Sequence, residues 1–188
     1  MRRPFAIGLL ILLILPRAGF ADEVRRTNVT NEVVEVSDTA VRKNGLLLVR
    51  GEPFTGILIE HFAEGGLKSR TCFAGGRQDG LSESWHANGR TNEVRQYRNG
   101  RKEGDNKGWW PNGKPRFEFH FRDGVYDGTC QEWYENGQLY RLNHFVAGEE
   151  VGAQRLWYDD GRVLANYVVK DGRRFGLTGA MGCYSVTK

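Results

Sequence analysis

Two histidines and a cysteine recur at a spacing that could build a metal site. His120 and His144 are separated by one 24-residue interval, and Cys72 lies two such intervals before His120. Imidazole and thiolate are ligands that zinc prefers, at about 2.0–2.3 Å from the metal. If each 24-residue unit is a hairpin of two strands about 4.8 Å apart, equivalent residues of neighbouring units lie roughly 10 Å apart. We therefore expect no metal site.

Residues for other catalytic chemistry do not form a recognisable motif either. Ser82 lies in a polar stretch without the Gly-x-Ser-x-Gly pattern of an exposed nucleophile. No lysine-serine or lysine-threonine pair follows a glycine at the spacing of a phosphate loop. The adjacent acids at 149–150 and 159–160 lie in segments with turn composition, where short polar residues serve turn geometry. The sequence predicts no catalytic residues, no cofactor and no enzymatic activity.

A 24-residue repeat must position all of these residues. Glycine recurs at this interval without an insertion or deletion over five copies. Such fixed self-similarity indicates stacked supersecondary units, and repeat scaffolds of this kind usually present binding surfaces. The lead glycines of the copies are Gly56, Gly80, Gly104, Gly128, Gly152 and Gly176.

Each copy has the pattern of a β-hairpin. In the copy 128–151, the segments 129–134 and 139–146 have strand character and flank Asn136-Gly137. Asn-Gly is the strongest short hairpin signal, and we assign it to a type I′ turn with positive φ at both residues. A second short turn connects each copy to the next. The predicted fold is all-β, with antiparallel β-hairpin repeats at the interval of the glycines forming an elongated, twisted single-sheet meander.

Three aromatic columns follow from the repeat. Large rings bury about 150–250 Å² each, so stacked copies would form a core from them. We predict that the fifth and the seventeenth positions after the lead glycine form the structural core. The sixth position would then point to the other face and offer partner contacts. The core positions are Trp85, Trp109, Trp133, Trp157, Phe73, Tyr97, Phe121 and Phe145, and the candidate contacts are Trp110, Tyr134 and Tyr158.

The first residues have the layout of a secretory signal peptide. A basic start at 1–3 precedes an apolar run of eleven residues at 5–15, and small residues follow at 16–21. Because a membrane-spanning helix needs about 20 apolar residues, the run is short for a transmembrane anchor. We expect a signal peptide at 1–21 and an exported protein, periplasmic, envelope-associated or extracellular. An uncleaved N-terminal anchor is the alternative.

The basic charge of the chain owes much to this leader. The whole chain has a formal net charge of +4 from 27 basic and 23 acidic residues, and three of the arginines lie in 1–21. Without them the net charge is +1. We therefore expect no nucleic-acid partner, since such binding depends on a surplus of basic residues.

The three cysteines are too far apart in the repeat for an internal disulfide. About two copies separate Cys72 from Cys130, and about two more separate Cys130 from Cys183. Two copies correspond to roughly 19 Å across four strands. A disulfide needs Cα atoms within about 7 Å. The sequence predicts free thiols.

The chain therefore divides into four segments. The signal peptide at 1–21 precedes N-terminal capping strands at 22–50. The repeat array of about five copies covers 51–176, and a C-terminal capping strand follows at 177–188.

The lead glycine, the aromatic pair, Asn-Gly, a further aromatic and a second glycine together resemble the MORN repeat in its bacterial MORN-2 variant. The opening Gly-Glu-Pro-Phe-Thr-Gly at 51–56 resembles the usual entry into such arrays, and the resemblance covers about residues 51–176. Many bacterial members carry the label of a YwqK-like antitoxin, which implies binding of a toxin protein and no catalytic residues. Eukaryotic relatives are associated with membrane-lipid and protein contacts. A leader peptide departs from the pattern of an antitoxin that acts in the cytoplasm.

We expect an exported, non-enzymatic repeat scaffold that binds another protein near the membrane or wall, with an antitoxin or immunity role implied by the resemblance. The alternative is an aromatic-repeat protein that binds cell-envelope carbohydrate. Those proteins usually have a shorter repeat with separate aromatic triplets, so the 24-residue step favours the first interpretation.

Overall fold

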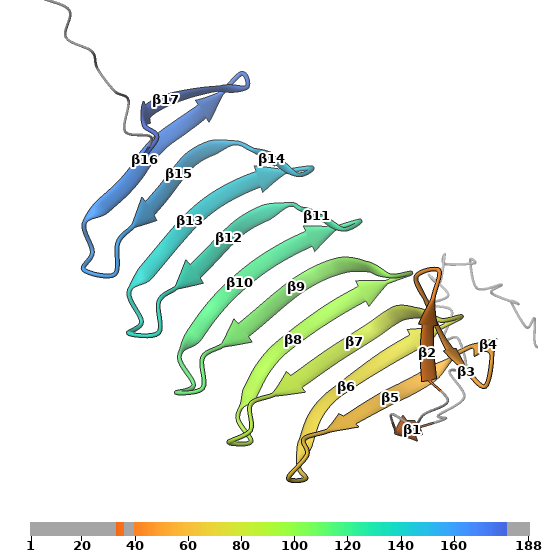
Figure 1. The fold of residues 1–188 in the computed structure, drawn as a ribbon. Coiled ribbons are helices and arrows are strands. Elements are labelled where there is room, and N and C mark those ends of the chain that lie inside the picture. Colours follow the sequence, from red (N-terminus) through yellow and green to blue (C-terminus); the bar gives the residue numbers. More distant parts are fainter. Residues whose placement is uncertain (1–32, 36–39, 180–188) are drawn as a thin grey trace, which may run out of the picture.

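The computed structural model describes residues 33–35 and 40–179, and these form strands and turns without a helix (Figure 1). In this part of the chain no helix is long and apolar enough to cross a membrane. The predicted leader at 1–21, the first residues of the predicted N-terminal cap and nearly all of the predicted C-terminal strand with Cys183 lie outside the described residues.

One open sheet of 14 strands carries the whole repeat array. Successive strands pair antiparallel along it, so the hairpins form a meander that twists and extends in one direction (Figure 1). The predicted all-β hairpin meander is confirmed. Its strands are β5 (Gly56–His61), β6 (Leu67–Ala74), β7 (Arg77–Trp85), β8 (Thr91–Arg98), β9 (Arg101–Trp109), β10 (Pro115–Arg122), β12 (Gly128–Trp133), β13 (Leu139–Val146), β15 (Gly152–Trp157), β16 (Val163–Lys170) and β17 (Arg173–Leu177), with the short β11 (Val125–Tyr126) on β10 and β14 (Glu149–Glu150) on β13.

The N-terminal end of the array is covered by a separate small sheet. Its strands are β2 (Ala40–Lys43), β3 (Leu46–Val49) and β4 (Glu52–Pro53). Leu47 and Phe54 from this segment pack with Leu58 and Phe73 of the first hairpin into a buried apolar cluster. The strand β1 (Val33–Glu35) pairs with β5 in parallel, and the three strands of the small sheet lie between them in the sequence.

The two kinds of turn differ from the sequence-based assignment. At Asn136-Gly137 only the glycine has a positive φ, at 94°. Gly137 N donates to Tyr134 O at 2.9 Å, and Tyr134 N donates to Gln138 O at 2.9 Å. This is the pattern of a type I turn closed by a glycine bulge, so the type I′ assignment is wrong at this site. Positive φ at two successive residues occurs in the other turn, at Ala147 (50°) and Gly148 (87°).

The lead glycines are explained by the backbone. All six have positive φ, between 59° and 154°, where an L side chain is strained. Three of them open strands β5, β12 and β15, and the other three lie inside β7, β9 and β17, three residues after the strand begins. The 24-residue interval of glycine therefore records a backbone conformation that recurs near the start of the first strand of each hairpin.

The turn asparagines connect each hairpin to the next. The Asn136 side chain accepts a hydrogen bond from Gln138 N at 2.8 Å and donates one to Asp159 O of the following turn at 3.1 Å. The same donation occurs in two earlier copies, so these amides form a ladder along the row of hairpin turns on one side of the sheet. The bonds of this ladder are Asn88 to Pro111 O, Asn112 to Glu135 O and Asn136 to Asp159 O. In the last copy, Asp160 keeps the acceptor, which Arg162 N uses, and lacks the amide donor.

Replacing Asn136 with alanine should destabilise the array more than replacing Asp160. Asn136→Ala removes both the acceptor within the turn and the donation to Asp159 O. Asp160→Ala removes an acceptor within the turn and an exposed ion pair with Arg162. The difference should be about 0.5–1.5 kcal/mol, the usual worth of one hydrogen bond. Urea unfolding of both variants measures it, and equal losses would contradict a ladder between repeats.

Candidate binding cleft

The two faces of the sheet carry different aromatic columns. Gly128 pairs with Phe145, so Phe145 shares its face, whereas Trp133 lies an odd number of residues along the same strand and points to the other side. We call the side of Phe145 the aromatic face. It carries the column at the seventeenth position after the lead glycine, and the four tryptophans predicted as core lie on the opposite face. The aromatic face has Phe73 and Phe121 buried and Tyr97 and Phe145 half-buried, and on the opposite face Trp85, Trp109, Trp133 and Trp157 are all half-buried.

A continuous group of rings occupies the middle of the aromatic face. Phe117 and Phe119 stack with centroids 4.7 Å apart and an interplanar angle of 12°. Tyr126 lies 5.4 Å from Phe119 and 4.6 Å from Phe121, and Phe145 lies 5.1 Å from Tyr126. Because the strand alternates, the sequence Phe-x-Phe-x-Phe of β10 places three rings on one side. These rings form an apolar floor across β10 to β13.

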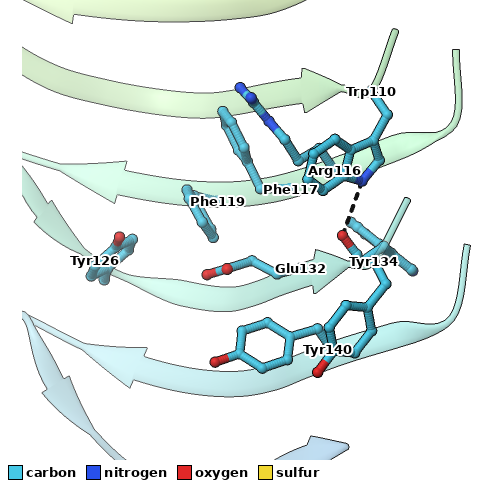
Figure 2. A pocket seen from close by; sticks show the side chains of 9 residues that line it. Trp110, Arg116, Phe117, Phe119, Tyr126, Glu132, Tyr134 and Tyr140 are labelled. Atoms are coloured by element: carbon cyan, nitrogen blue, oxygen red, sulfur yellow. Dashed lines mark hydrogen bonds between the residues drawn. The ribbon is translucent and has the colours of Figure 1, made fainter. Parts of the chain in front are cut away.

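A cleft of about 540 Å³ opens next to this floor. Figure 2 shows rings from three strands and the turns beside them converging on it, with one arginine and one glutamate. Trp133 reaches the cleft at the bulge that ends β12. The cleft is lined by Trp110, Arg116, Phe117, Phe119, Tyr126, Glu132, Trp133, Tyr134 and Tyr140.

The cleft depends on a glycine. Phe117 pairs with Gly108 across β9 and β10 and lies flat over its backbone. A Cβ on Gly108 would stand 2.3 Å from the Phe117 ring, so a side chain there would displace the ring. The equivalent positions in the flanking copies are Ser84 and Glu132. A glycine inside a strand often marks such a close approach.

One carboxylate holds two guanidinium groups at the edge of the cleft. Glu93 accepts hydrogen bonds from Arg95, at 2.6 Å, and from Arg116. Both arginines also lie over the Phe117 ring, at 5.1 and 5.2 Å from its centroid, and Arg116 lies 5.7 Å from the Trp110 ring. Burial alone would raise the pKa of Glu93, but hydrogen bonds and charge from the two arginines outweigh it and the pKa is lowered.

The other wall of the cleft has a second ion pair. Arg141 donates to Glu132 and lies 5.9 Å from the Tyr140 ring. Tyr140 packs edge-on against Tyr134, with centroids 5.1 Å apart. The cleft therefore has aromatic walls, and its carboxylates are already engaged by arginines of the same chain.

Two of the three candidate contact residues lie in the cleft. Trp110 Nε1 donates to Trp133 O and Tyr134 OH donates to Trp157 O, both at 3.0 Å (Figure 2 draws the first). His86 Nε2 makes the equivalent bond to Trp109 O at 2.9 Å. The polar atoms of this column thus join neighbouring hairpins. Tyr158 is 40% exposed and lies outside the cleft.

Most of the cleft residues were missed by the sequence reasoning, which followed columns shared by all copies. Phe117, Phe119, Tyr140 and Arg116 vary from copy to copy. The signals that could have found them were the alternating phenylalanines of 117–121 and the unusual glycine at 108.

The histidines and cysteines lie in other surroundings. His120 Nδ1 pairs with Asp105 at 2.6 Å, and His144 Nδ1 pairs with the Thr129 hydroxyl at 3.1 Å, both on the opposite face. Within residues 33–35 and 40–179, no three His, Cys, Asp or Glu side chains gather closely enough to hold a metal ion. The two described cysteines, on β6 and β12, are free thiols with four strands between them.

The repeat geometry agrees with a comparison against known families. The sequence model described as MORN repeat variant matches residues 102–123 and 126–147. Residues 102–147 are therefore similar to two MORN repeats. The two matched segments contain every residue that lines the cleft, from Trp110 to Tyr140. MORN repeats are typically protein- or membrane-binding repeat modules, which is consistent with a repeat scaffold. None of the curated proteins compared with the chain matches it.

A side chain at position 108 should disturb the cleft through Phe117. Gly108→Ala places a methyl group against the ring, and overpacking of this kind costs about 1–3 kcal/mol. In a Phe117→Ala background the same substitution should cost much less, because the ring it meets is gone. A double-mutant cycle by urea unfolding tests the coupling, and equal costs in both backgrounds would contradict it.

Loss of Glu93 should destabilise the fold in a pH-dependent way. Its pKa in the folded state lies below its ordinary value of 4.5, so its stabilisation is present above that pH and disappears as the pH falls through the folded pKa. Glu93→Gln should cost about 1–3 kcal/mol at pH 7, because it leaves Arg95 and Arg116 without their carboxylate.

The difference in free energy of unfolding between Glu93→Gln and the wild type, measured by urea unfolding, should become smaller as the pH falls below 4.5. Glu118→Gln is the matched control, since Glu118 forms an exposed pair with Lys107 and should cost less than about 1 kcal/mol. A gap for Glu93→Gln that is the same at all pH values would refute the assignment.

Proposed function

We propose that this chain is an exported, non-enzymatic MORN scaffold that binds another protein through the cleft on its aromatic face. The observation that carries the proposal is the cleft itself, an aromatic hollow of about 540 Å³ on one side of an extended sheet. Pockets lined by Trp, Tyr and Arg are where protein interfaces concentrate their binding energy.

The arginines that lie over the rings of the cleft favour a protein ligand over an envelope carbohydrate. Arg116 lies over the Trp110 ring and Arg141 over the Tyr140 ring, so two of the rings already stack with cations of this chain. A sugar that binds by stacking would need those ring faces free. A protein side chain can instead enter the hollow between the rings.

The leader-like segment 1–21 supports export, which places the partner in the envelope or outside the cell. The resemblance to antitoxin-labelled MORN proteins makes a toxin or effector protein the first partner class to seek. Export of the chain and a toxin or effector partner are both parts of the proposal that go beyond the repeat array. The two fit together if the partner is itself secreted.

Photo-crosslinking tests the proposal. With a photo-reactive phenylalanine analogue in place of Tyr140, irradiation of the native envelope should attach one defined protein to the chain. The same analogue at Val168, which is 46% exposed on the opposite face, is the matched control and should attach none. Attachment of glycan alone, or of the same proteins at both positions, would overturn the proposal.

A further inference from the structure

The cleft continues into a group of cations on β8 and β9 of the aromatic face. Lys102 Nζ lies 5.0 Å from the centroid of the Phe121 ring, and Phe121 stacks on Tyr126, which lines the cleft. Arg95 lies over Phe117, another lining residue. The aromatic floor and this cationic edge therefore form one surface.

The charges of this surface do not balance. Its cations are Arg95, Lys102, Arg116 and Arg141, and its carboxylates are Glu93 and Glu132. Glu93 serves two arginines and Glu132 serves the third.

Lys102 forms no ion pair with any residue in the described part of the chain. Burial and the nearby Arg95 lower the pKa of Lys102 and outweigh the opposing effect of Glu93. The Nε of Arg116 is also buried and without an acceptor among the described residues.

We propose that the partner presents an acidic segment here, with one large apolar side chain in the cleft and a carboxylate on Lys102. The inference rests on the proposed function and names the chemistry of the partner. An added carboxylate would supply the anion that Lys102 lacks, and the neighbouring rings exclude water and strengthen the pair. The apolar side chain would provide most of the buried area, in the manner of an interface anchor.

An anionic membrane surface fits these residues less well. Electrostatic attraction to anionic lipids sums over several basic side chains, each worth about 1 kcal/mol near the surface. The surplus cations here are few and half-buried among rings, so they suit one or two carboxylates at fixed positions.

Peptide selection tests the inference directly. A library of random peptides displayed on phage is selected on the purified chain, and the enriched peptides are synthesised and titrated against it. They should carry Asp or Glu within a few residues of a large apolar side chain. Lys102→Glu should weaken their binding about tenfold or more, since it replaces an attraction with a repulsion. A peptide with Lys in place of its acid should regain binding to that variant.

Lys107→Glu is the matched control, because Lys107 lies on the same strand, points to the opposite face and undergoes the same change of charge. It should leave peptide binding unchanged, and circular dichroism checks that both variants fold. Enrichment of peptides without an acid, no enrichment at all, or an equal loss in both variants would overturn the inference. So would Lys102-dependent binding to phosphatidylglycerol vesicles in place of peptides.

The two proposals fail separately. A protein crosslinked at Tyr140 whose binding does not depend on Lys102 would remove the acidic segment and keep the protein-binding scaffold. If no protein is crosslinked at Tyr140 and no acidic peptide is enriched, both the protein-binding scaffold and the acidic segment are ruled out.

Discussion

Every repeat of this protein depends on its neighbours for hydrogen bonds, because a single open sheet has no second layer to pack against. Backbone pairing joins the strands, and side chains at fixed positions add two further ladders. One runs through the turn asparagines and the other through His86, Trp110 and Tyr134, each donating to a carbonyl of the next hairpin. These bonds require the same spacing in every copy. This is consistent with the absence of an insertion over the five copies.

The cleft arises where the copies stop being alike. Gly108 removes a side chain, Phe117 takes its place, and the rings of β10 then stack along one face. The arginines of β8 and β10 lie against the Phe117 ring, and Arg141 of β13 lies against the Tyr140 ring. Together the three arginines share two glutamates. Repetition thus supplies a rigid frame, and a local departure from it supplies a surface with its own shape and charge. In this protein most residues that line the cleft are ones that distinguish one copy from the next.

The sequence was sufficient to predict the fold, because the glycine interval and the strand alternation are local properties. The hairpins, their turns and the antiparallel order follow from them, and the structure confirms this order. The type I′ turn was placed at the wrong site, since Asn-Gly serves two turn types and the choice depends on where the bulge falls. The cleft was not predicted beyond Trp110 and Tyr134. Its other members come from four strands, and apart from Trp133 no column shared by all copies marks them.

The amino-acid sequence by itself determined a 24-residue hairpin repeat, the positions of its glycines and the separation of its histidines and cysteines. Only the tertiary structure decided which aromatic column shares a face with which. A strand alternates strictly along its own length, but the pairing register and the bulge before each turn decide which residues of neighbouring strands meet. That register brings Phe117 over Gly108 and Lys102 beside the cleft, and it therefore shapes the surface that we propose binds a partner.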